Sequence, residues 1–359
     1  MYGLSWFCAE QHLSTGAQEL LLHVELSERE AKKFADSKLG TECYSIWYLF
    51  TRGKGLDQDH MMIRTPTTLG LMHPQATSPQ DMKNISQHIF DQLVHYLKYA
   101  SSAYTPVCPR PNGSTLITHF SDPVAGIVEG FVARDASRKE LVLALRGSAS
   151  FADILLDTQV QLVPLVSPGV SVPHGVRVHA GFLTAWNSVS VQVLAILAEQ
   201  LLLHEDIQTI VTSGHSMGGS LATLSAVSTK QRFPQCRVMS YSYGAPRTGN
   251  KAFAEFFNES LGEDVFRVVH TYDGVPTMIS QSLGYHHHGI EYWHNSEPAT
   301  VKNVVKCDAH GEDPNCSLSI PSSGVNDAHL TVGTRLLEHI HLLNLLKYFG
   351  IVATTPFCL

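Results

Sequence analysis

Hydrophobic residues first fall into a regular pattern after about eighty irregular positions. From Ile85 onward, apolar side chains recur every three to four residues, which is the period of an amphipathic helix. Two apolar runs follow at 126–134 and 140–145, and a turn-like segment at 135–138 separates them. The pattern therefore predicts a helix that ends near Ser101, followed by a β-hairpin.

Alternating helices and strands are predicted for the rest of the chain. A long helix to about His204 has one apolar face, which is formed by Trp186, Val189, Val193, Leu197 and Leu201. Further strands are predicted at 209–212, 238–243 and 265–271, and a further helix begins near Leu221. Strands that alternate with helices indicate a mainly parallel sheet with helices on both faces.

The first 82 residues carry no candidate site. A Thr/Pro/Met-rich segment at 61–82 is typical of a linker. We therefore expect residues 1–82 to be a weakly ordered or peripheral extension, and we place the folded domain at 83–359.

Composition and charge narrow the classes of function. With 44% hydrophobic and 16% charged residues, the chain can form one large core. A net charge of −7 without any basic run argues against nucleic acid as the main partner. No apolar stretch reaches the roughly 18 residues of a membrane span, so we expect no transmembrane segment.

The strongest chemical signal is a serine between a predicted strand and a predicted helix. Ser216 is the centre of Gly214-His215-Ser216-Met217-Gly218, the G-x-S-x-G pattern of a nucleophile elbow. The sharp turn strains the serine backbone, and the two glycines avoid collisions with it. The hydroxyl then projects at a helix N-terminus, where free N–H groups favour a developing negative charge. Ser216 is therefore the candidate nucleophile.

A serine nucleophile needs a base, usually histidine, that is oriented by a carboxylate. In chains with a nucleophile elbow, the three residues occur along the sequence in the order Ser, Asp, His. Asp273 is the best carboxylate because it directly follows a predicted strand, at the sheet edge that presents Ser216. We favour His329 as the base, since it lies in a polar segment from which an imidazole can turn toward Ser216. The histidines that follow the candidate carboxylate are His286, His287, His288, His294, His310, His329, His339 and His341.

The three consecutive histidines at 286–288 resemble a metal-binding tract. No cysteine or acidic ligand pattern surrounds them, so we expect them to pack near the site instead. Neither a metal nor a cofactor is expected.

Several motifs together resemble the fungal class 3 lipases, a group that includes triacylglycerol lipases and related feruloyl esterases of filamentous fungi. The resemblance extends from about Ser86 to Leu359 and implies an α/β-hydrolase fold, with a central, mainly parallel sheet and helices on both faces. The motifs are ALRGS at 144–148, VHAGF at 178–182, GHSMGG at 214–219, YGAPR at 243–247, DGVP at 273–276 and GIEYW at 289–293.

The resemblance implies roles for individual residues. Ser216 corresponds to the nucleophile, Asp273 to the orienting acid and His329 to the base. Ser148 and Met217 correspond to the two residues whose backbone N–H groups form the oxyanion hole, and the Ser148 hydroxyl is a further donor there.

A short amphipathic segment at 149–157 would by itself be most simply a core helix. The resemblance implies instead that this segment is a lid, which covers the site in water and turns its apolar face toward lipid. The apolar side chains of the lid are Phe151, Ile154, Leu155 and Leu156.

The resemblance also organises the cysteines. Cys108 and Cys358 correspond to a bridge between the two ends of the domain, while Cys307 and Cys316 bracket a short loop and would pair easily. Disulfides suit an oxidising compartment, so we expect a secreted protein although no signal-peptide pattern opens the chain. We hypothesise that the first eighty residues are not the natural start.

These features predict hydrolysis of fatty-acyl esters of glycerolipids at an oil–water interface. A feruloyl or other soluble-ester esterase is the alternative among enzymes, and a non-catalytic lipid-binding relative is the alternative outside them. The apolar lid favours lipid. The intact serine, acid and histidine favour an enzyme.

The chain departs from the family pattern just after the candidate base. In the family, His-Leu-Thr is followed directly by Tyr-Phe-Gly, whereas residues 332–347 separate the two triplets here, at 329–331 and 348–350. The inserted segment has the spacing of a short amphipathic helix and adds His339 and His341 as competing bases. Three explanations compete: a benign loop extension, a base shifted to His341, and an in-frame gene-model error such as a retained intron. We favour the last, because the flanking residues rejoin into the family pattern when the segment is removed.

Deletion of 332–347 is expected to give an enzyme at least as active as the full chain, with His329 still essential. The reason is that misplacing an imidazole by about 1 Å costs on the order of 10²-fold in rate. Transcript sequencing and the ester-hydrolysis rates of His329→Ala and His341→Ala test this. A transcript that retains the segment, with activity lost only in His341→Ala, would contradict both the intron hypothesis and the choice of base.

Overall fold

The computed structural model describes residues 83–105, 108–122, 128–147, 160–321, 324–329 and 358. The predicted extension at 1–82, the lid at 149–157 and the segment at 332–347 lie outside these residues.

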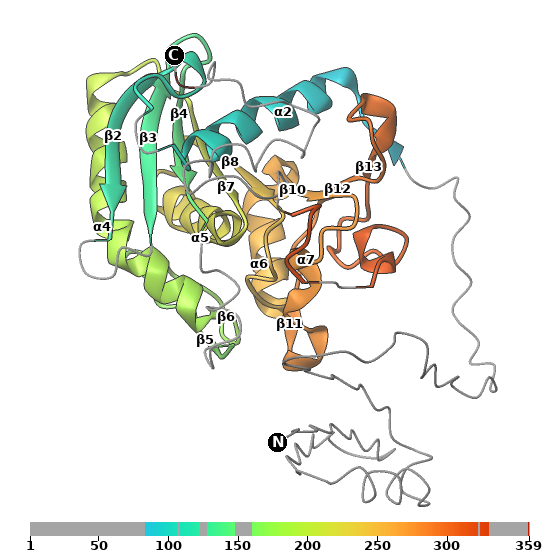
Figure 1. The fold of residues 1–359 in the computed structure, drawn as a ribbon. Helices are drawn as coiled ribbons and strands as arrows, with labels where there is room; N and C mark the ends of the chain where they lie inside the picture. The colour runs from blue at the N-terminus through green and yellow to red at the C-terminus, as the bar shows by residue number, and fades with distance from the viewer. Residues whose placement is uncertain are drawn as a thin grey trace, which may run out of the picture. The chain divides into compact units, whose positions relative to one another are not determined.

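A nine-stranded sheet forms the centre of the described domain (Figure 1). Its strand order is β1-β13-β12-β10-β8-β7-β4-β3-β2. The central strands β4, β7, β8, β10 and β12 run parallel, and the strands at both edges pair antiparallel. The strands are β1 (Lys83–Asn84), β2 (Thr115–Ser121), β3 (Glu129–Asp135), β4 (Glu140–Leu145), β7 (Thr209–His215), β8 (Arg237–Tyr243), β10 (Val265–His270), β12 (Glu291–His294) and β13 (Val304–Lys306).

Helices cover both faces of this sheet, as predicted (Figure 1). Helix α2 (Gln87–Ser102) packs on one face and matches the predicted amphipathic helix. The other face is covered by α4, α5 and α6. These three helices are α4 (Ala180–Leu203), α5 (Met217–Arg232) and α6 (Lys251–Leu261). A one-turn helix, α7 (Val275–Met278), follows β10.

Strand β4 shows how the sequence divides the core between the two faces. All six of its residues are buried. Leu141, Leu143 and Leu145 pack toward α4 and α5, whereas Val142 and Ala144 pack toward α2. Because successive side chains of a strand point to opposite faces, a continuous apolar run is the pattern expected for a strand covered on both sides.

A second, four-stranded antiparallel sheet lies beside the main one, in the order β11-β9-β6-β5. Its strands are only two or three residues long, and no hydrophobic pattern predicted them. They are β5 (Leu162–Pro164), β6 (Arg177–His179), β9 (Gly249–Asn250) and β11 (Tyr285–His286).

Helix α4 is long and apolar enough to cross a membrane, with 24 residues and a mean hydropathy of 1.5 over its most apolar window. The sequence analysis did not single out this segment as a possible span. One helix of this length and composition is weak evidence for a membrane span, because core helices share both properties. The apolar face predicted for α4 is buried, however, at Trp186, Val189, Val193 and Leu197. The Trp186 indole N–H also donates to Ser228 Oγ of α5 at 2.9 Å. These contacts are those of a core helix.

The described residues contain two disulfides, and they are the two pairs that the sequence analysis named. Cys108–Cys358 joins residues 250 positions apart, and Cys307–Cys316 joins residues 9 positions apart. In the chain-entropy account, a bridge that closes a longer loop restricts the unfolded chain more. The first bridge therefore has the larger expected effect on stability.

The first turn of α4 is capped by His179. Its Nδ1 accepts a hydrogen bond from the Phe182 backbone N–H at 3.3 Å, and its ring stacks on the Phe182 ring. The side chain is fully buried. Burial lowers the pKa of His179 from 6.5 to about 4. The cap therefore requires a neutral imidazole.

The stability of the domain should depend on pH through His179. The unfolded chain takes up a proton near pH 6.5, whereas the folded chain does not until about pH 4, so folding becomes less favourable as pH falls through this window, by up to about 3 kcal/mol. His179→Asn retains a side-chain cap acceptor but does not titrate. We expect its Tm to fall less than that of the wild type between these two pH values, as measured by calorimetry. Parallel Tm–pH curves for the two proteins would contradict this assignment.

Candidate active site

Ser216 stands in the turn between β7 and α5, with φ 59° and ψ −131°. A positive φ is rare for a residue with a side chain and is kept only where the surroundings enforce it. Two glycines make the turn possible. A Cβ on Gly214 would lie 2.1 Å from the Gly218 carbonyl oxygen, and a Cβ on Gly218 would lie 2.2 Å from the Leu145 carbonyl oxygen. The chain therefore has the strand–turn–helix geometry of a nucleophile elbow.

The three side chains that the sequence analysis selected are joined by hydrogen bonds. His329 Nε2 lies 3.0 Å from Ser216 Oγ. On the other side of the ring, His329 Nδ1 lies 3.1 Å and 3.0 Å from the two Asp273 carboxylate oxygens. All three residues are buried. This order of atoms allows a proton to move from the serine hydroxyl to the imidazole while the carboxylate holds the ring.

Strand order explains how Ser216 and Asp273 meet. Ser216 follows β7 and Asp273 follows β10, and both strands pair in parallel with β8, which lies between them. The ends of parallel strands meet at one edge of a sheet, and this edge is where α/β folds place their sites. Asp273 is fixed further by the Val275 N–H, which donates to its Oδ1 at 2.9 Å.

His329 comes from a separate loop, which Asn326 and His270 hold in place. Asn326 Oδ1 accepts hydrogen bonds from the backbone N–H groups of Ala328 and His329 at 3.0 Å and 3.2 Å. Asn326 Nδ2 donates to the Tyr272 carbonyl at 2.7 Å, and His270 Nδ1 bonds to the Ala328 carbonyl at 2.9 Å. The loop with His329 is thus attached to the segment that carries Asp273.

Comparison with known proteins identifies the family. A family model for class 3 lipases matches residues 142–283. A lipase of Rhizopus niveus is 32% identical over an alignment of 260 residues, and the match covers 67% of this chain and 63% of that protein. The secreted mono- and diacylglycerol lipase 1 of Fusarium solani is 31% identical over an alignment of 253 residues, and the match covers 66% of this chain and 72% of that protein. The chain belongs to the class 3 lipases.

Solved structures agree with this assignment. A triacylglycerol lipase of Penicillium expansum superposes with a TM-score of 0.66 at 26% identity, over 77% of this chain and 99% of that one. The predicted α/β-hydrolase fold is therefore confirmed. This chain covers 63% of the length of the Rhizopus niveus lipase, which is less than two thirds.

The sequence analysis did not select His215, which lies against the His329 ring, or Tyr104, which contacts His215. His215 stacks on it, with ring centroids 4.6 Å apart and planes 26° apart. Burial, followed by the neighbouring His329, holds the pKa of His215 well below its usual value, so the ring stays neutral. The Tyr104 hydroxyl lies 3.1 Å from His215 Nδ1 and accepts a hydrogen bond from the Gly147 N–H at 3.0 Å. Tyr104 thus connects the residue before Ser148 to the residue before Ser216.

The residues expected to form the oxyanion hole are described only in part. Met217 is the first residue of α5, and the first four N–H groups of a helix have no partner within the helix. Its position beside Ser216 suits a donor for an oxyanion. Ser148 and the lid residues Phe151, Ile154, Leu155 and Leu156 lie outside the described residues. Their roles stay predictions.

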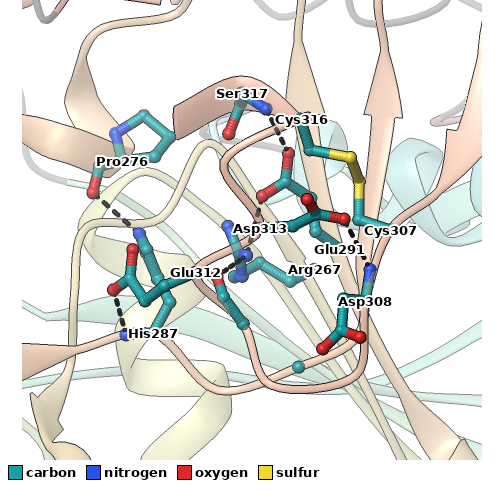
Figure 2. Close-up of polar contacts among 12 residues, drawn as sticks. Arg267, Pro276, His287, Glu291, Cys307, Asp308, Glu312, Asp313, Cys316 and Ser317 are labelled. Atoms are coloured by element: carbon teal, nitrogen blue, oxygen red, sulfur yellow. Dashed lines mark hydrogen bonds and ion pairs between the residues drawn. A yellow bond between two sulfur atoms is a disulfide. The ribbon is translucent and has the colours of Figure 1, made fainter. Parts of the chain in front are cut away.

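A layer of buried charge supports the chain that follows Asp273 (Figure 2). Arg247 binds Glu312 through two nitrogens at 2.7 Å and 2.8 Å, and Glu312 also accepts the His287 N–H at 2.7 Å. His287 Nε2 donates to the Pro276 carbonyl at 2.7 Å. A continuous set of hydrogen bonds therefore extends from Arg247 to α7, the helix that begins just after Asp273.

A second buried ion pair lies in the same layer. Arg267 donates to Glu291 at 2.8 Å and to the Gly311 carbonyl at 2.7 Å, and both charged side chains are almost fully buried. Figure 2 shows this pair inside the loop closed by the Cys307–Cys316 disulfide. A charge that loses its partner in such a place costs roughly 3–5 kcal/mol, so the two arginines fix the position of this loop.

The consecutive histidines at 286–288 contribute packing and hydrogen bonds. Burial, with Arg267 and Arg247 adding to it, holds the pKa of His287 well below its usual value. Burial and Arg267 lower the pKa of His288 to about 3. His287 bonds to the Pro276 carbonyl and His288 to the Gly289 carbonyl. The position of His287 agrees with the expectation that the tract packs near the site.

Proposed function

We propose that this class 3 lipase hydrolyses carboxylester bonds of fatty-acyl glycerolipids through a covalent acyl-enzyme. The observation that carries the proposal is the hydrogen-bonded order Ser216–His329–Asp273 at the end of the sheet. The names of the relatives support the substrate class, because they include a triacylglycerol lipase and a mono- and diacylglycerol lipase.

In the proposed reaction, His329 Nε2 takes the Ser216 hydroxyl proton while Oγ bonds to the acyl carbon. The tetrahedral intermediate collapses as His329 returns that proton to the leaving glyceride oxygen, and the acyl group stays on Ser216. Water then enters, gives a proton to His329 and attacks the acyl carbon, and the fatty acid leaves as Ser216 regains its proton. Asp273 holds the ring in the tautomer with hydrogen on Nδ1 and stabilises the imidazolium.

In this proposal the backbone N–H groups of Met217 and Ser148 stabilise the oxyanion. The first turn of α5 supplies the Met217 group. In the proposed reaction, the side chains Ser216, His329 and Asp273 carry every proton and acyl transfer.

We further propose that the protein acts outside the cell, at a lipid surface. Relatives are named secreted lipases. The disulfides Cys108–Cys358 and Cys307–Cys316 suit an oxidising compartment. A soluble-ester esterase is the rival function, and hydrolysis rates on tributyrin, triolein, a galactolipid and methyl ferulate would separate the two.

Ser216→Ala is expected to abolish ester hydrolysis and to leave the fold intact, because loss of a catalytic-triad residue removes on the order of 10⁴ to 10⁶ in turnover. The rate on an activated ester and the circular dichroism spectrum measure the two effects. A variant that keeps more than a tenth of the wild-type rate would show that Ser216 is not the nucleophile.

The lid predicts how activity depends on the physical state of the substrate. If the apolar face at 149–157 binds lipid, hydrolysis of tributyrin should rise sharply once the substrate exceeds its solubility. Phe151→Ser combined with Leu155→Ser should blunt this rise, since less apolar surface meets the interface. Phe151→Leu combined with Leu155→Met is the matched control, which retains apolar contact and should keep the rise. A smooth saturation curve for the wild type would favour the soluble-ester alternative.

A further inference from the structure

Two buried histidines lie side by side at the ends of neighbouring parallel strands. His270 ends β10 and His294 ends β12, and the register of the two strands pairs these residues directly. Because paired residues of adjacent strands point to the same face of a sheet, their imidazoles meet. The ring centroids are 5.0 Å apart, and the planes differ by 29°.

A carboxylate completes a group of three around these rings. Glu297 follows β12 by three residues, and its Oε1 lies 2.9 Å from His270 Nε2. One ligand atom from each of His270, His294 and Glu297 lies within 4.8 Å of the others. The two histidine side chains are buried, and the Glu297 side chain is 49% exposed. The group is therefore open to solvent on the Glu297 side.

Two imidazoles and one carboxylate form a donor set that zinc and related ions prefer, with water as the fourth ligand. Metal-binding histidines usually donate their other ring N–H to a carbonyl or carboxylate, which fixes the tautomer. His270 meets this requirement, because its Nδ1 bonds to the Ala328 carbonyl at 2.9 Å while Nε2 faces Glu297. Calcium and magnesium would prefer an all-oxygen site.

The other two groups of this kind among the described residues do not suit an ion. Glu291 lies beside Cys307 and Cys316, but these cysteines form a disulfide and offer no thiolate. In the group of His95, Asp135 and Glu140, the Arg138 guanidinium lies 3.2 Å from Glu140 and supplies a positive charge there.

We propose that His270, His294 and Glu297 bind one divalent transition-metal ion of the zinc class. The sequence analysis expected no metal, and the donors are separated by 23 and 2 intervening residues, so no short motif connects all three. The ion ties the ends of β10 and β12 to the turn that carries Glu297. His270 lies three residues before Asp273, and its Nδ1 bonds to the Ala328 carbonyl in the loop of His329. The ion would therefore stabilise the segments that carry Asp273 and His329 without taking part in the reaction.

The test uses the full chain, freed of metal by dialysis against a chelator, and titrates it with Zn²⁺ by calorimetry and with Co²⁺ by visible absorption. Glu297→Gln removes the half-exposed ligand with little risk to the fold, and His294→Gln removes a buried one. His310→Gln is the matched control, since His310 pairs with Asp308 on the exposed surface and belongs to none of the three possible ligand groups among the described residues. Such a control is needed because the chain has 20 histidines, many of which can bind zinc weakly.

We expect the wild type and His310→Gln to bind one Zn²⁺ tightly, with the absorption of four-coordinate Co²⁺ and a Tm raised by Zn²⁺. In Glu297→Gln and His294→Gln, affinity should fall by about tenfold or more, and the Tm shift should be lost. The proposal is overturned if the wild type shows no tight site or if Glu297→Gln binds as the wild type does. A correctly folded His294→Gln that retains full affinity also overturns it. Because these readouts are independent of ester hydrolysis, failure of this proposal leaves the proposed lipase function untouched.

Discussion

The first turn of α5 lies almost in contact with the end of β4, and this close approach sets the position of Ser216. Gly218 stands where any Cβ would collide with the Leu145 carbonyl, and Gly214 where any Cβ would collide with Gly218. Helix and strand can approach only because both positions lack a side chain. The helix N-terminus and the strained serine then come to the same point as the residues that follow β4. Ser216, the first turn of α5 and the two residues that follow β4, Arg146 and Gly147, are thus parts of one packing contact.

The remaining parts of the site are brought to this point by hydrogen bonds that extend well beyond the triad. Strand order positions Asp273, because β8 lies between β7 and β10 and the ends of all three strands lie at one edge of the sheet. Hydrogen bonds of Asn326 and His270 position His329, because they attach its loop to the segment that carries Asp273. His215 then covers the imidazole from the side of the elbow. A positioned imidazole matters because small displacements of a base cost large factors in rate.

Buried charge gives the support its definite geometry. Arg247 with Glu312 and Arg267 with Glu291 are almost fully removed from water, and each arginine also binds a backbone carbonyl. Buried ion pairs are weak sources of net stability, since desolvation offsets their attraction. Breaking one is nevertheless costly, so alternative positions of this loop are disfavoured. The neighbouring His287 and His288 stay neutral first because they are buried, and the positive charge of Arg267 beside both of them lowers their pKa further.

The sequence by itself determined the strands β4, β7, β8 and β10, the helices α2, α4 and α5, and the serine elbow. Each depends on local rules. The apolar run from Leu141 to Leu145 forms a strand that is buried on both faces. Apolar residues every three to four positions between Trp186 and Leu197 form one face of a helix, and Gly214 and Gly218 permit the sharp turn at Ser216. It also selected Asp273, because a polar residue directly after a buried strand lies at a known edge. The sequence analysis favoured His329 among eight later histidines, from its polar segment and from the family resemblance. Only the tertiary structure shows that its Nε2 lies beside Ser216, since a loop position has no periodicity that fixes where it packs. The same holds for Tyr104, for the short strands of the second sheet and for the meeting of His270, His294 and Glu297. These arrangements depend on strand register and on contacts between residues far apart in the chain, and no local pattern encodes them.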